Sequence, residues 1–272
     1  YHLQLPPTYA TFEAASAAAA QYSDGFPAWI DGRYYVRVGA YLDSTSAQAA
    51  QASLGLTGAT VAGTSGAGIS VVKTGTNTVL FQFDSTSGLY LAVKPGRDDT
   101  GKAETYFRGY SYFGAFEYRR NGGDITVVNV LSMDDYLQGV IVQEMSPSWP
   151  LEALKAQTVC ARSYAYGKLQ AGKHQSQGFD LCNTTDCQAY VGIATASDNS
   201  RRAVEETSGV LLSSAILVIA RVLEEVTSPI TASTLSLETR RCMALAASTL
   251  SLLSSITISL MVSPFFNVGV MA

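Results

Sequence analysis

The stretch YLQGVIVQEM, residues 136–145, places a carboxylic acid among apolar helix positions. Four residues fall at positions i, i+3, i+4 and i+7 and share one helical stripe: Leu137, Val140, Ile141 and Glu144. Burial disfavours a charged carboxylate and therefore raises its pKa. A glutamate of this kind keeps its proton near neutral pH and can act as the general acid in glycoside cleavage. The alternative is a glutamate at a helix end, partly exposed or capped by a neighbour.

Two cations follow in the run PLEALKAQTVCARSYAYGKLQ. Lys155 and Arg162 are seven residues apart, so on a helix they share a stripe about 10 Å long. Tyr166 lies beyond them on the same side. Two cations beside an aromatic ring can bind a carboxylate or hydrogen-bond to sugar hydroxyls. The alternative is a solvated basic stripe on a surface helix.

The number of nearby carboxylates limits the reaction. Ordinary glycoside hydrolases use two carboxyl groups about 5–9.5 Å apart. Asp134 and Asp135 lie nine or ten residues before Glu144, roughly 13–15 Å along a helix, and Asp180 or Asp186 would be a distant second partner. A single acid fits a lytic transglycosylase, in which one group protonates the glycosidic oxygen. The same group then acts as the base while the C6 hydroxyl closes an anhydro ring.

A potential metal site follows the second helix. His174, Cys182 and Cys187 lie within 14 residues, and Asp186 stands beside the last cysteine. Histidine nitrogen, cysteine thiolate and carboxylate oxygen are all zinc ligands. These residues therefore form a candidate structural zinc site, while no cofactor is required for the reaction. The alternatives are a Cys182–Cys187 disulfide, or two free thiols.

The elements that position these residues indicate an α+β protein, with a strand-rich N-terminal half followed by a helical catalytic core. Ser132, with Asp135 three residues later, predicts the start of a helix that ends near Met145. Pro150 predicts the first turn of a second helix, and Gly172 lies just past its end. The formal net charge of −4 argues against nucleic acid as a partner.

The N-terminal half has strand and turn patterns after an Ala-, Ser- and Pro-rich beginning. Residues 1–30 are interpreted as a linker or an anchor remnant. Residues 33–42 alternate as in a strand, and STSAQAAQASL predicts a Ser-capped helix. Hairpins are predicted over residues 68–85 and 117–132. The chain begins with Tyr1 and shows no signal peptide, so a leader was removed or the chain is a fragment.

The composition changes at residues 211–272, where Leu, Ser and Thr dominate. This tail is interpreted as non-native or frameshifted. Two alternatives remain: an ordinary soluble Ser/Leu-rich region, or a membrane segment over residues 243–262. The many Ser and Thr residues weaken the membrane interpretation.

A family resemblance adds to this interpretation. The run VVNVLSMDDYLQGVIVQEMSPSWPLEALKAQTVCARSYAYGK closely resembles the stage II sporulation protein D family of peptidoglycan lytic transglycosylases. GFDLCNTTDCQAYVG and AVEETSGV resemble later blocks of the same family. The predicted catalytic domain spans residues 100–210.

The resemblance implies roles for individual residues. Glu144 matches the catalytic acid, and Lys155 and Arg162 match the basic residues of the active site. Four residues are assigned to substrate binding: Gln157, Ser163, Tyr164 and Gln188. Gln157 points away from the basic stripe, so a structural role is the alternative, and Tyr164 is equally suited to a core. Some members hold zinc with a second histidine beside the last cysteine, where this chain has Asp186.

The resemblance also implies a substrate, a partner and a location. Family members cut peptide-stripped glycan strands between MurNAc and GlcNAc and leave 1,6-anhydro-MurNAc. They act with the amidase stage II sporulation protein P during engulfment, at the cell envelope or the forespore–mother cell interface. Membrane anchoring is expected in the full-length protein, through an N-terminal helix that is not visible here. The alternative function is a non-catalytic peptidoglycan-binding protein with a degenerate active site.

A second, shorter resemblance concerns the N-terminal half. RYYVRVGAYLDSTSAQAAQASL is similar to the start of a sporulation-related (SPOR) repeat, a small module that binds peptide-stripped glycan. The predicted module spans residues 31–95. The alternative is any strand–helix unit that packs in a domain core.

Overall fold

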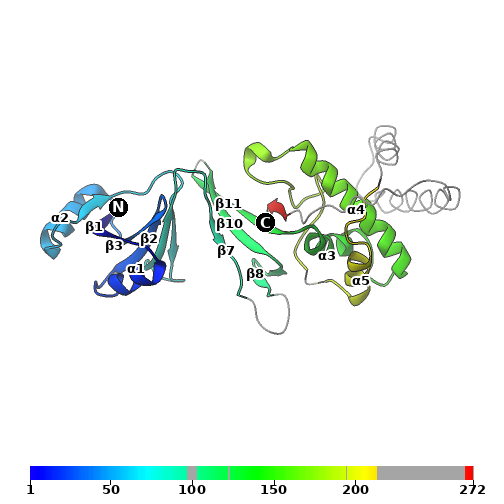
Figure 1. The fold of residues 1–272 in the computed structure, drawn as a ribbon, viewed down its shortest axis with the longest axis horizontal. Helices are drawn as coiled ribbons and strands as arrows, with labels where there is room; N and C mark the ends of the chain where they lie inside the picture. The colour runs from blue at the N-terminus through cyan, green and yellow to red at the C-terminus, as the bar shows by residue number, and fades with distance from the viewer. Residues whose placement is uncertain (97–102, 122, 194, 213–266, 272) are drawn as a thin grey trace. The chain divides into compact units, whose positions relative to one another are not determined.

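The computed structural model describes residues 1–96, 103–121, 123–193, 195–212 and 267–271 (Figure 1). It confirms an α+β protein in which, among the described residues, most strands lie in the N-terminal half and the longest helix lies in the C-terminal part. The chain divides into two compact units. The first comprises residues 1–93 and 117–127, and the second comprises residues 94–116 and 128–272.

The first unit contains a six-stranded sheet in the order β4-β1-β3-β2-β6-β5. The strands are β1 (His2–Tyr9), β2 (Gly25–Ile30), β3 (Arg33–Val38), β4 (Thr60–Ala62), β5 (Ile69–Val72) and β6 (Val79–Asp84). Helices α1 (Phe12–Ala19) and α2 (Ser44–Leu54) contact this sheet. Up to β4, the order β-α-β-β-α-β is the split βαβ arrangement.

The core of this unit lies between one face of the sheet and the two helices. Alternation along β1 and β3 directs every second side chain to that face. The buried residues of this core are Leu3, Leu5, Ala19, Val36, Val38, Ala47 and Ala59. On the opposite face, Arg37 is also buried, and its guanidinium donates to the side-chain oxygens of Gln4, at 2.8 Å, and Gln82, at 2.5 Å.

Three expectations for this half are corrected. Residues 1–30 are not a linker, because they form two strands of the sheet, β1 and β2, and the helix α1 that contacts it. A module boundary at residue 31 would separate β2 from β3, which pair antiparallel from Ile30 opposite Arg33. Helix α2 is capped by Asp43, not by a serine, and the Asp43 Oδ1 accepts from the Ser46 amide at 2.7 Å. The resemblance to a SPOR repeat stays a prediction.

The two predicted hairpins are present. β5 and β6 pair antiparallel, and β10 (Ala115–Asn121) and β11 (Asp124–Ser132) are neighbours in a sheet of order β12-β11-β10-β7. Its other strands are β7 (Leu91–Val93) and β12 (Asn267–Met271). A separate hairpin consists of β8 (Thr105–Phe107) and β9 (Tyr110–Tyr112).

The predicted tail can be compared only at its ends. Residues 211 and 212 are described, and the Leu212 amide donates to the Ser163 hydroxyl at 2.8 Å. Residues 267–271 form β12, which pairs antiparallel with β11. The possible membrane segment at 243–262 lies outside the described residues. Within the described part of the chain, no helix has both the length and the apolar character needed to cross a bilayer.

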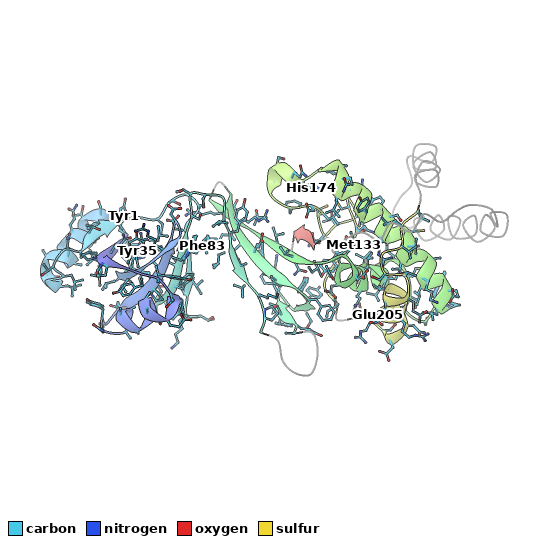
Figure 2. The ribbon with its side chains drawn as sticks, viewed as in Figure 1. Tyr1, Tyr35, Phe83, Met133, His174 and Glu205 are labelled. Carbon is cyan, nitrogen blue, oxygen red and sulfur yellow. The ribbon has the colours of Figure 1, made fainter. Side chains whose placement is uncertain are left out.

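In the described part of the second unit, the main helices are α3 (Met133–Glu144), α4 (Leu151–Ala171) and α5 (Asp198–Glu206). Each of them contacts the other two (Figure 1). Figure 2 labels Met133 at the start of α3, Glu205 in α5, and His174 in the loop after α4. Isoleucine, methionine, leucine and alanine side chains form the core between the helices: Ile141, Met145, Leu154 and Ala203.

Candidate functional site

Helix α3 presents Glu144 as its last residue. The helix begins as expected, because the Ser132 hydroxyl accepts from the Asp135 amide at 3.1 Å and donates to the Asp135 carboxylate at 2.8 Å. The three apolar residues of the predicted stripe are fully buried: Leu137, Val140 and Ile141. Glu144 continues this stripe to the helix end and is half-buried. The predicted stripe is confirmed.

The environment of Glu144 favours its protonated form. Burial raises the pKa of the Glu144 carboxyl above its ordinary value. The C-terminal end of a helix carries partial negative charge, which acts in the same direction. Among the described residues, no hydrogen bond or ion pair engages the Glu144 side chain.

A buried tyrosine lies in the electrostatic reach of Glu144. Burial, with smaller effects of neighbouring groups that include Glu144, raises the pKa of Tyr136 well above its usual range. The Tyr136 hydroxyl donates to Gln188 Oε1 at 3.2 Å, and Gln188 Nε2 donates to the Ala161 carbonyl at 3.4 Å. Gln188 therefore links α3 to α4 from the loop that follows His174.

The Arg162 guanidinium is buried and engaged by other parts of the protein. Its Nη2 donates to Asp134 Oδ1 at 2.9 Å, and its Nη1 donates to the Thr207 carbonyl at 2.7 Å. Longer contacts reach the carbonyls of Val204 and Val210. Arg162 thus connects the start of α3 with the end of α5, because Asp134 is in the first turn of α3 and Thr207 caps α5.

Lys155 is also paired. Its ammonium lies 2.8 Å from Glu152 Oε1 and 2.6 Å from Glu206 Oε2. These hydrogen bonds raise the pKa of Lys155, and the Lys155 hydrogen bond lowers the pKa of Glu206. Within the described residues, neither Lys155 nor Arg162 forms an ion pair with Glu144. The structure therefore gives both cations partners in α5 that sequence spacing did not predict.

The other three predicted binding residues lie on α4 in different surroundings. Ser163 is buried and structural, because its hydroxyl donates to the Val159 carbonyl at 2.7 Å and accepts from the Leu212 amide. Tyr164 is half-buried, and the Lys168 ammonium lies 4.9 Å from its ring centre. Gln157 is buried on α4, and no hydrogen bond joins its amide to another residue in the described ranges.

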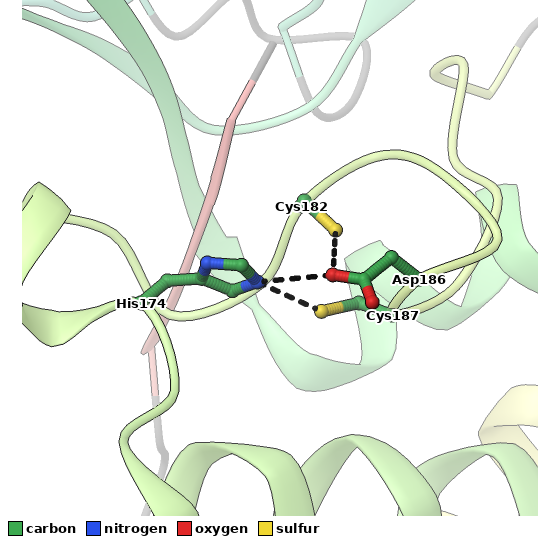
Figure 3. Close-up of side chains that lie close together, drawn as sticks. All are labelled: His174, Cys182, Asp186 and Cys187. Carbon is green, nitrogen blue, oxygen red and sulfur yellow. Dashed lines mark hydrogen bonds and ion pairs between the residues drawn. The ribbon is translucent and has the colours of Figure 1, made fainter.

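The predicted metal ligands converge after α4 (Figure 3). One ligand atom from each of His174, Cys182, Asp186 and Cys187 lies within 4.8 Å of all the others. His174 Nε2 is 3.3 Å from Cys187 Sγ and 3.7 Å from Asp186 Oδ2, which is 3.6 Å from Cys182 Sγ. Tetrahedral ligands at zinc distances are about 3.5 Å apart, so this set fits zinc. Both cysteines are free thiols here, not a disulfide.

Sequence reasoning missed the partners that orient the site. Glu206 is the last residue of α5 and Thr207 is its C-cap, and Lys173 pairs with Asp186 beside the cysteines. The AVEET block, residues 203–207, contains both Glu206 and Thr207. Its resemblance to a family block is the sequence signal that these two residues lie near the site. No local pattern indicated which side chains they meet.

Comparisons with known proteins find one family model and two relatives, each of which matches part of this chain. The family model described as Stage II sporulation protein matches residues 121–213. An uncharacterized protein of Brachyspira hyodysenteriae is 39% identical over 99 residues, which are 36% of this chain and 27% of that protein. The Amidase enhancer of Bacillus subtilis is 46% identical over 76 residues, 28% of this chain and 10% of that protein. The chain thus spans a minor part of each relative, and no solved structure matches it.

Proposed function

We propose a function on the premise that residues 121–213 belong to the stage II sporulation protein D family. The chain acts on the cell wall in sporulation, and this domain is a lytic transglycosylase that cuts peptidoglycan glycan strands. One observation carries the proposal: Glu144 is half-buried at the end of α3, its pKa is raised by burial, and no described side chain pairs with it. These are the properties of a general acid that awaits a substrate oxygen.

The proposed reaction uses Glu144 twice. The protonated carboxyl first gives its proton to the glycosidic oxygen between MurNAc and GlcNAc while the bond from C1 to that oxygen breaks. The carboxylate then takes the proton of the MurNAc C6 hydroxyl as O6 bonds to C1. The products are a 1,6-anhydro-MurNAc end and a new GlcNAc end, and the carboxyl group regains its proton. No water is consumed.

A single-carboxylate reaction is supported by the contacts of four other acids on the helices. Asp134 is held by Arg162 and by the Ser208 hydroxyl, and Asp135 is held by the Ser132 cap. Glu152 and Glu206 are held by Lys155. A two-carboxylate hydrolase would need one of these groups near Glu144, but their contacts assign them to helix ends and ion pairs.

Lys155 and Arg162 support the acid indirectly in this proposal. Arg162 fixes α3 against α5 through Asp134 and the Thr207 carbonyl, so it is a positioning residue for Glu144. Lys155 does the same for α4 and α5 through Glu206. Gln157 is buried on α4 and keeps the substrate-binding role that the family resemblance implies as a proposal.

The substrate and the partner are proposed from the family. The substrate is glycan from which stem peptides have been removed, outside the cytoplasmic membrane at the envelope or the forespore–mother cell interface. An amidase of the stage II sporulation protein P type would produce it, and a relative that is named Amidase enhancer is consistent with such a partnership. The second candidate, a non-catalytic peptidoglycan-binding protein, has no contact in the described residues that favours it.

The cleavage proposal is tested with purified peptide-free glycan strands. The full chain should release products that end in 1,6-anhydro-MurNAc, detected by mass spectrometry, and Glu144→Gln should release none. Glu205→Gln, which changes an exposed acid of α5, is the matched control and should retain cleavage. Binding without cleavage by the unaltered chain would identify a binding protein, and products that have gained water would identify a hydrolase.

We also propose a structural zinc ion on His174, Cys182 and Cys187, whose candidate ligand atoms lie within 4.8 Å of one another. A bound zinc ion would join the loop after α4 into one rigid piece. That loop carries Gln188, whose amide connects Tyr136 in α3 to Ala161 in α4. The ion would therefore stabilise the helix pair that presents Glu144.

A further inference from the structure

Asp186 occupies a particular position relative to the other three candidate ligands. Its Oδ2 faces Cys182 Sγ at 3.6 Å and His174 Nε2 at 3.7 Å (Figure 3). Its Oδ1 lies 2.5 Å from the Lys173 ammonium, which also contacts Oδ2 at 2.6 Å. One oxygen therefore faces the ligand cluster, while the carboxylate as a whole is held by a cation from outside the cluster.

We propose that Asp186 Oδ2 is the fourth metal ligand and that Lys173 is the charge-balancing partner of this carboxylate. The inference rests on the zinc ion proposed above, and it is independent of glycan cleavage. Four protein ligands complete the tetrahedral coordination that structural zinc requires. The site would hence be closed to water, as expected of a structural ion.

Charge supports the role of Lys173. Two thiolates and one carboxylate carry three negative charges, and a divalent ion leaves one of them uncompensated. The Lys173 ammonium supplies the missing positive charge at hydrogen-bond distance. When Oδ2 binds the ion, Oδ1 can keep its hydrogen bond to Lys173, and such outer partners orient ligands and strengthen metal binding. Lys173 therefore assists the ion instead of competing with it.

The burial of the cluster agrees with this arrangement. Cys182 and Cys187 are buried, His174 is half-buried and stacks on Phe179, and the side chain of Asp186 is 56% exposed. Three ligands are thus fixed within the protein, and the fourth approaches from the surface together with Lys173. Loss of Asp186 should weaken the site without removing its buried part.

The test measures metal affinity in the full chain. Metal is removed with a chelator under reducing conditions, and Zn²⁺ is titrated back against a chromophoric chelator. The unaltered chain should bind one ion. Lys173→Met should bind about 10–100-fold more weakly, as expected for loss of an outer partner, and Asp186→Asn should lose at least as much. Asp198→Asn and Lys168→Met remove an exposed acid and a nearby lysine as controls and should not change the affinity.

Cobalt(II) provides a second measurement that does not depend on activity. The visible spectrum of the Co²⁺-loaded chain should show the bands of a tetrahedral ion with sulfur ligands. These bands should change in Asp186→Asn but not in Asp198→Asn. An unchanged affinity and spectrum in Asp186→Asn would remove Asp186 as a ligand. Tighter binding by Lys173→Met would show that the lysine competes with the ion. Absence of binding by the unaltered chain would overturn the whole site, whatever the result on glycan.

Discussion

Glu144 is the residue at which stability and function oppose each other. Its apolar surroundings penalise the carboxylate, and no described side chain compensates for the charge. The protonated group that a general acid needs is therefore the form that the fold prefers. Natural proteins often retain such costly groups at functional sites.

Replacement of Glu144 by glutamine should stabilise the protein in a pH-dependent way. Because the pKa of Glu144 is raised in the folded protein, the folded state binds its proton more tightly than the unfolded state. Its stabilising contribution is complete below the ordinary glutamate pKa and is lost as the pH rises through the raised value. The midpoint of thermal unfolding of Glu144→Gln should therefore match the unaltered chain at acidic pH and exceed it at neutral pH.

Calorimetry at a series of pH values checks this difference, with Glu205→Gln as the control for an exposed acid. A constant difference between the two chains at every pH would indicate a packing effect and not a raised pKa. Cleavage should decline over the same rising pH range, because the deprotonated carboxyl can no longer give a proton.

Sequence alone predicted the acid but not the surroundings of the cations. The i, i+3, i+4, i+7 stripe is local, so helical spacing was enough to place Glu144 beside Ile141. Arg162, by contrast, meets Asp134 and Thr207, which are 28 and 45 residues away in the chain. Helical spacing cannot indicate partners on other helices. The sequence spacing of Arg162 is therefore the same whether its guanidinium is buried or solvated.

At the scale of elements, Arg162 is the main polar connection between α3, α4 and α5. Arg162→Lys should lower stability by about 2–4 kcal/mol, because a lysine cannot reach both a carboxylate and several carbonyls and leaves buried oxygens unpaired. Arg202→Lys, on the exposed side of α5, should change stability by less than about 0.5 kcal/mol. Urea unfolding measures both variants.

The kinetics of Arg162→Lys separate a positioning role from substrate contact. A positioning residue should reduce kcat with little change in KM, and the loss of activity should accompany the loss of stability. A rise in KM at unchanged stability would instead place the guanidinium on the glycan, as the family resemblance implied.

Two glycines of the helices should respond in opposite directions to alanine. A Cβ atom at Gly139 in α3 would lie 2.4 Å from the Gly192 carbonyl oxygen and 2.6 Å from the Tyr190 ring. Gly139→Ala should therefore cost about 1–3 kcal/mol through overpacking. A Cβ atom at Gly167 in α4 meets nothing within 4 Å, so Gly167→Ala should stabilise by about 0.5–1 kcal/mol. Equal effects at both positions would contradict the packing of α3 against the loop at Gly192.

At the scale of the whole molecule, composition was a weaker guide than pairing. The richness of residues 1–30 in alanine, serine and proline indicates a linker, yet β1 pairs with both β3 and β4. Short strands with few charges resemble linkers until their partners are known, and these partners lie dozens of residues away. The hairpins were predictable because strand, turn and strand are adjacent in the chain.

The end of the chain shows the same limitation and can be tested directly. Residues 267–271 belong to a tail that was interpreted as non-native, but β12 adds five residue pairs to β11, and Val270 is buried and bridges to Leu181. Val270→Asp should therefore destabilise the second unit by about 3 kcal/mol or more, since a buried charge without a partner is costly.

Trp149 fluorescence in a chain whose other tryptophan, Trp29, is replaced by phenylalanine reports this loss. Val72→Asp on β5, where the side chain is 48% exposed, is the control. If both variants unfold at the same urea concentration as the parent, β12 contributes nothing to the sheet. That result would support the interpretation of residues 211–272 as a non-native or frameshifted tail.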